Sequence, residues 1–80
     1  MNVREKIEKI PLGSSEIVHE NRRYLVSRRD FNRGKSIKVY AEALDGSDFI
    51  SFNFYETTTG QHLKPCEMPS EKVIRFLSIY

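Results

Sequence analysis

The chain has 80 residues, which is enough for one small domain and too few for two. Its 13 basic and 11 acidic residues leave a net charge of only +2, and a hydrophobic content of 39% argues against a disordered chain. The single cysteine, Cys66, excludes an internal disulfide framework and fits a reducing cytoplasm, where we expect the protein to be located. No apolar run approaches the roughly 20 residues of a membrane span, so we expect no membrane partner and no signal peptide.

Residues 1–13 are expected to form a short helix or a loosely attached arm. Apolar residues with the helical spacing i, i+4, i+7 are Val3, Ile7 and Ile10. Asn2 is a suitable N-cap for the first turn, and Pro11 ends the helical pattern. Because so short a helix is not stable alone, we expect it to be ordered only if it docks on the rest of the domain.

Residues 15–66 are expected to form an antiparallel sheet of four or five strands. The clearest strand lies near the middle, where Ile37, Val39 and Ala41 alternate with polar side chains. Such alternation is typical of a strand with one buried and one solvated face. Turn residues separate the candidate strands, which cover residues 15–20, 23–31, 37–43, 48–56 and 62–66.

Residues 70–79 are expected to form an amphipathic helix, with Ser70 as its N-cap. Apolar residues recur at helical spacing at Val73, Phe76, Leu77 and Tyr80. A stripe this wide can cover one face of a sheet. The sequence therefore predicts a single α+β domain over residues 1–80: an antiparallel meander, a C-terminal helix packed on one face, and a short N-terminal helix or arm.

The basic residues are concentrated in one predicted hairpin. Seven of the 13 fall within residues 22–38, which contain one acid and carry a net charge of +6, whereas residues 39–63 carry −4. A locally basic hairpin on a nearly neutral protein indicates an anionic partner. Alternatively, the charges protect an exposed strand edge from aggregation. The sequence leaves both interpretations open.

The same hairpin combines cations with aromatic side chains. Arg29 and Phe31 lie two residues apart on one strand and therefore share a face. Lys38 and Tyr40 have the same relationship on the next strand. Such a face suits single-stranded nucleic acid, because cations bind phosphates and bases stack on rings. The alternatives are that Phe31 is a core residue and Tyr40 an ordinary surface residue of a strand.

The segment RRYLVSRRDFNRGKSIKVY resembles the first hairpin of the positive cofactor four family of transcriptional coactivators. The resemblance extends loosely over residues 22–77, and its matches by type are Arg29-Asp30-Phe31, Gly34-Lys35 and Lys64-Pro65. It implies a curved antiparallel sheet with a helix, dimerisation through that helix, and binding of single-stranded DNA or melted duplex. It also implies that Lys64 contacts the nucleic acid. The family's basic run after Lys-Pro is replaced here by Cys66-Glu67-Met68.

We therefore expect a non-enzymatic, homodimeric domain that binds single-stranded DNA or RNA. The candidate contacts are Arg28, Arg29, Phe31, Arg33, Lys35, Lys38, Tyr40 and Lys64. The alternative is a protein-interaction module. In it, the acidic stretch 39–63 of one copy meets the basic hairpin of another, or a partner adds a strand at a sheet edge.

A thiol-dependent enzyme is a third hypothesis, because Cys66 is the one candidate nucleophile. The chain also resembles short uncharacterised bacterial proteins, some of them labelled peptide methionine sulfoxide reductase, but the Gly-Cys-Phe-Trp motif of that enzyme is absent. In an extended segment His62 would stand about 13 Å from Cys66, too far to act as its base. His19, His62 and Cys66 also lack the close spacing of zinc motifs. We therefore expect no catalytic residue, metal or cofactor.

Overall fold

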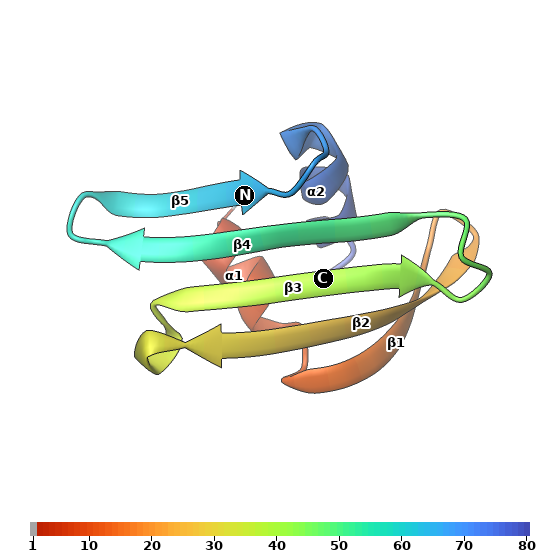
Figure 1. The fold of residues 1–80 in the computed structure, drawn as a ribbon, viewed down its shortest axis with the longest axis horizontal. Helices are drawn as coiled ribbons and strands as arrows, with labels where there is room; N and C mark the ends of the chain where they lie inside the picture. The colour runs from red at the N-terminus through yellow and green to blue at the C-terminus, as the bar shows by residue number, and fades with distance from the viewer. Residues whose placement is uncertain (1) are drawn as a thin grey trace.

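The computed structural model describes residues 2–80, in which five antiparallel strands form one open sheet with the order β1-β2-β3-β4-β5 (Figure 1). The strands are β1 Gly13–His19, β2 Arg22–Phe31, β3 Ser36–Ala43, β4 Phe49–Thr57 and β5 Gly60–Pro65. The helices are α1 Val3–Glu8 and α2 Ser70–Leu77, and a 3₁₀ turn, η1 Asn32–Gly34, joins β2 to β3. The α+β meander predicted from the sequence is confirmed.

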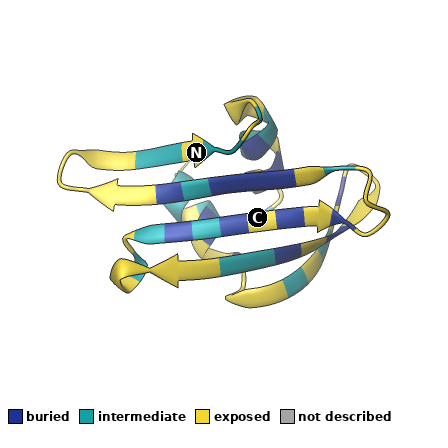
Figure 2. Ribbon diagram, in the orientation of Figure 1, coloured by how far each residue is buried: buried dark blue, intermediate teal, exposed yellow. Residues whose placement is uncertain are grey.

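Both helices cover the same face of the sheet, which we call the helix face; the other is the open face. In Figure 1 the helices pass behind the sheet, so the viewer looks onto the open face. In β3, Ile37, Val39 and Ala41 are buried beneath the helices, whereas Lys38 and Tyr40 alternate with them and lie on the open face. The same alternation appears as colour bands along β3 in Figure 2, whereas β4 has a continuous buried stretch because Ser51 of the open face is buried as well.

The core lies between the helix face and the two helices. Ile7 of α1 and Phe76 of α2 are fully buried, as are Val39 and Phe52, which face each other across β3 and β4. Burial of each such side chain stabilises the fold by roughly 1.5–3 kcal/mol. Asn2 caps α1 as expected, because its side-chain oxygen accepts a hydrogen bond from the backbone N–H of Glu5 (3.2 Å).

The second helix begins one residue earlier than the sequence suggested. Ser70 was expected to be the N-cap, but the cap position is occupied by Pro69, whose extended backbone precedes the first turn. Ser70 already belongs to that turn, and the backbone N–H of Lys72 bonds to the carbonyl of Pro69 (3.1 Å). No side chain accepts a hydrogen bond at this cap. Neither described helix is long and apolar enough to cross a membrane.

Asp48 ties α2 to the sheet from the turn between β3 and β4. It accepts hydrogen bonds from the hydroxyl of Tyr24 (2.7 Å) and from Nζ of Lys72. Partial burial alone would raise the pKa of Asp48, but the bonds donated by Lys72 and Tyr24 outweigh it and hold the pKa below its usual value. Burial and the bond to Asp48 raise the pKa of the Tyr24 hydroxyl.

Replacing Asp48 by Asn should destabilise the fold by about 1–3 kcal/mol at pH 7, because Lys72 loses its charged partner. A lowered folded-state pKa contributes stability above the unfolded value of about 3.9, and this contribution is lost as the pH falls through the folded value. In urea unfolding, the wild type should therefore have a higher free energy of unfolding than Asp48→Asn at pH 7. Near pH 2 the two values should be nearly equal. The exposed carboxylate of Glu42 supplies the control, since Glu42→Gln should change stability by less than about 0.5 kcal/mol. A gap between wild type and Asp48→Asn that is equally large at both pH values would contradict the role of the charge.

Candidate nucleic-acid interface

Four polar side chains form a line across the open face, which we call the basic row. Strand pairing places Arg29 of β2 opposite Lys38 of β3, Lys38 opposite Asn53 of β4, and Asn53 opposite Lys64 of β5. Neighbouring strands are about 4.8 Å apart, so the row crosses the sheet over roughly 14 Å. Three of its four members are cations, and each comes from a different strand.

A second row, which we call the aromatic row, runs parallel to the basic row and lies two residues closer to the β2–β3 turn on each strand. Its members, in strand order from β2 to β5, are Phe31, Ser36, Tyr55 and His62. Three of the four side chains carry a ring, and the exception is Ser36. The two rows are separated by roughly 6.7 Å, the length of two residues in a strand. Phe31 is 50% exposed and Tyr55 38% exposed, so both rings reach the solvent. Phe31 is therefore a surface residue of the open face and no part of the core.

Tyr40 lies on the other side of the basic row, two residues from Lys38 on β3. Its ring stacks on that of Phe49, with centroids 6.2 Å apart and planes inclined by 25°. Tyr40 is exposed. The structure therefore places rings on both sides of the basic row.

Arg33 and Lys35 extend the positive charge beyond the end of the sheet. Both are exposed in the turn that follows Phe31. Arg33 has φ = 58° and Gly34 φ = 84°, as a tight reversal between β2 and β3 requires. Arg4 of α1 holds the turn from the helix face by donating hydrogen bonds to the Gly34 carbonyl (3.1 Å) and to Glu56 (2.9 Å).

The cations at this end of the open face have no acidic partner among residues 2–80. No carboxylate in that range lies within ion-pair distance of the five residues concerned, which are Arg29, Arg33, Lys35, Lys38 and Lys64. Nζ of Lys38 instead bonds to Ser51 Oγ (3.0 Å) and Cys66 Sγ (3.5 Å). The acids of the open face, Glu16 and Glu42, lie at the opposite end of the sheet. The open face is therefore polarised along the strands.

Arg28 is the one candidate contact that the structure does not bring together with the others. It lies on the helix face, where Nη1 donates to the carbonyls of Glu8 (3.3 Å) and Ile10 (2.8 Å) at the end of α1. Its Nε and Nη2 bind both carboxylate oxygens of Asp30 (2.9 and 2.8 Å). Only 10% of its side chain is exposed. Arg28 therefore attaches α1 to the sheet. Arg29, the next residue, extends from the open face.

Cys66 lies on the open face beside the basic row. Its Sγ accepts hydrogen bonds from Lys38 Nζ and from Asn53 Nδ2 (both 3.5 Å). The ring of His62 contacts the hydroxyls of Thr57 and Thr59 instead (3.3 Å each). No histidine of the described residues is hydrogen-bonded to the thiol, and these residues hold no cluster of three metal-ligating side chains.

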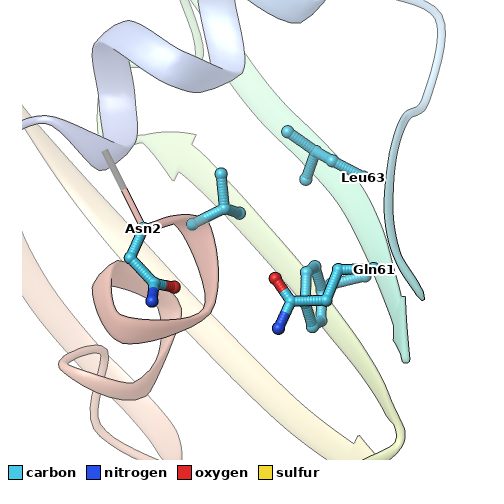
Figure 3. A pocket seen from close by; sticks show the side chains of 5 residues that line it. Asn2, Gln61 and Leu63 are labelled. Carbon is cyan, nitrogen blue, oxygen red and sulfur yellow. The ribbon is translucent and has the colours of Figure 1, made fainter. Parts of the chain in front are cut away.

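A hollow of the described surface lies on the helix face, away from both rows. It has a volume of about 420 Å³ and is lined by Val3, Phe54 and Leu63, with the amides of Asn2 and Gln61 at its margin (Figure 3). Its lining contains no charged and no nucleophilic side chain. The hollow is separate from the open-face residues.

Sequence reasoning missed four members of the two rows: Ser36, Asn53, Tyr55 and His62. The alternation of β4 already placed Asn53 and Tyr55 on one face with Phe49 and Ser51. The sequence did not give the register that aligns Asn53 with Lys38 and Tyr55 with Ser36. Register depends on both strands of a pair, so the pattern of one strand does not determine it.

The chain matches no family model, no curated protein and no solved structure. The resemblance of residues 22–77 to the positive cofactor four family stays a prediction.

The opposite placement of two adjacent arginines gives a direct test of the two faces. Arg28→Met should lower the free energy of unfolding by about 1.5–3 kcal/mol, because the carbonyls at the end of α1 and the carboxylate of Asp30 lose a charged donor. Arg29→Met should change it by less than about 0.5 kcal/mol. Urea unfolding of both variants measures the difference. Equal destabilisation by the two substitutions would show that the faces are assigned incorrectly.

Proposed function

We propose that this protein binds single-stranded nucleic acid on the open face of its sheet. The observation that carries the proposal is the basic row lying beside the aromatic row on a face that neither helix covers. A nucleotide presents a charged phosphate on one side and a flat base on the other. Two adjacent parallel rows, one cationic and one aromatic, match that division.

The contacts divide by chemistry. Arg29, Lys38 and Lys64 bind phosphates along the basic row, and Arg33 and Lys35 add charge at the end of the sheet. Phe31 and Tyr55 stack on bases on one side of the row, and Tyr40 on the other. Base stacking on an aromatic side chain is worth roughly 1–3 kcal/mol and depends little on sequence. The site therefore binds single strands with little base preference.

Protein docking is the second candidate, and the apolar end of the open face favours it. Val18 and Leu25 are 65% and 46% exposed at the end opposite the basic row, which is also the end where Phe49 begins β4. A second copy of the chain that covered these side chains would form a homodimer, through this face of the sheet and not through the C-terminal helix as the resemblance implied. A dimer without affinity for nucleic acid would favour this function over the first.

Titration with a fluorescent oligo-dT strand at several salt concentrations tests the main proposal. Neutralisation of three to five phosphates on a single strand predicts a slope of log K against log salt between about −2 and −3.5. An unlabelled duplex should compete weakly. If the strand is not bound at low salt, the proposal is wrong.

Removing two cations of the basic row should weaken binding and flatten the salt dependence together. Arg29→Ala combined with Lys64→Ala should lower the magnitude of the slope by about 1.4, because each phosphate contact on a single strand contributes about 0.7. The matched control combines Arg23→Ala and Lys9→Ala, which removes the same charge from exposed positions outside the row. Equal losses in the two double variants would mean that net charge alone, and no defined row, binds the strand.

A further inference from the structure

The two exposed rings of the aromatic row are separated by a small residue. Phe31 extends from β2 and Tyr55 from β4, and the residue between them on β3 is Ser36. Two strand spacings separate the attachment points of the rings by about 9.6 Å. The serine side chain is too short to fill the space between the rings.

The spacing of these two attachment points matches what one flat base requires between two rings, and we call the space between the rings the slot. Successive stacked bases are about 3.4 Å apart, so a base held between two rings needs about 7 Å between the ring planes. Rings attached about 9.6 Å apart reach that separation by leaning slightly toward each other. On the basis of the proposed function, we infer that Phe31 and Tyr55 sandwich a single unpaired base above Ser36.

The hydroxyl of Ser36 forms the floor of this slot. Its Oγ accepts a hydrogen bond from Asn32 Nδ2 (3.3 Å), which leaves its own proton to donate. An inserted base presents its edge to that hydroxyl. Lys38 follows two residues along β3 and binds the phosphate next to the inserted base.

The other aromatic pair of the open face offers no such slot. Tyr40 and Phe49 occupy neighbouring strands and are already stacked on each other. A base can cover Tyr40 only from one side. The sandwich therefore distinguishes Phe31 and Tyr55 from the remaining rings.

The slot also defines the class of ligand. A base in a duplex is stacked on both faces by its neighbours and paired along its edge, so it cannot enter between two rings. A base in a flexible single strand can turn out of its stack at small cost. The slot thus selects strands with unpaired bases of either DNA or RNA.

A double-mutant cycle on the full chain tests the sandwich, with the fluorescent oligo-dT strand as the probe. Phe31→Leu and Tyr55→Leu keep an apolar side chain but remove a flat ring, and each should weaken binding on the order of tenfold. If both rings hold the same base, removing either ring already releases that base from the sandwich. The double variant should then fall well short of the roughly hundredfold product of the two single effects.

Tyr40 supplies the matched control for the cycle. Phe31→Leu combined with Tyr40→Leu should give the full product, because these rings serve different bases. Full additivity for Phe31 and Tyr55 as well would overturn the sandwich while leaving the proposed function intact. Failure of the wild type to bind the strand would overturn both.

Filling the slot provides a second, independent test. Ser36→Val places a larger side chain that suits a strand between the rings, and it should weaken oligo-dT binding on the order of tenfold without lowering the melting temperature. Ser14→Val makes the same change on the open face of β1, about 13 Å along the strands from the level of Phe31 and Tyr55, and should leave binding unchanged. Unchanged binding by Ser36→Val would show that no base enters the gap.

Discussion

The arrangement of the open face depends on the register in which β2, β3, β4 and β5 pair. A shift of one residue in any strand would exchange its two faces and send its buried side chains into solvent. Val39 and Phe52, paired across β3 and β4 and both fully buried, make such a shift costly. The packing of the helix face therefore fixes positions on the open face that no helix touches. The basic row is aligned by the core behind it.

The sequence alone predicted those elements whose pattern has one interpretation. The alternation of Ile37, Val39 and Ala41 gave β3 its buried face, and the stripe of Val73, Phe76 and Leu77 gave α2 the side that packs on the sheet. The N-terminal helix was left open as an arm, since its order depends on docking that a local pattern does not contain.

The site was predicted less completely because β2 has no purely apolar face. Charged residues occur on both sides of its second half, so the sequence could not show that Arg28 faces the helices and Arg29 the solvent. Arg28 faces the helices because the carbonyls at the end of α1 accept hydrogen bonds from its guanidinium. These carbonyls replace the water molecules that an exposed guanidinium would bind. Tyr55 was overlooked for a related reason, since its neighbours in the row belong to other strands.

The position of Cys66 has a practical consequence. It is the chain's one cysteine, and its sulfur lies within 3.5 Å of Lys38 and Asn53 in the basic row. A maleimide dye would therefore attach at a single known place beside the proposed path of the strand. Because the attachment point is part of the natural chain, the dye would report on the surroundings of the basic row in real time without an engineered cysteine.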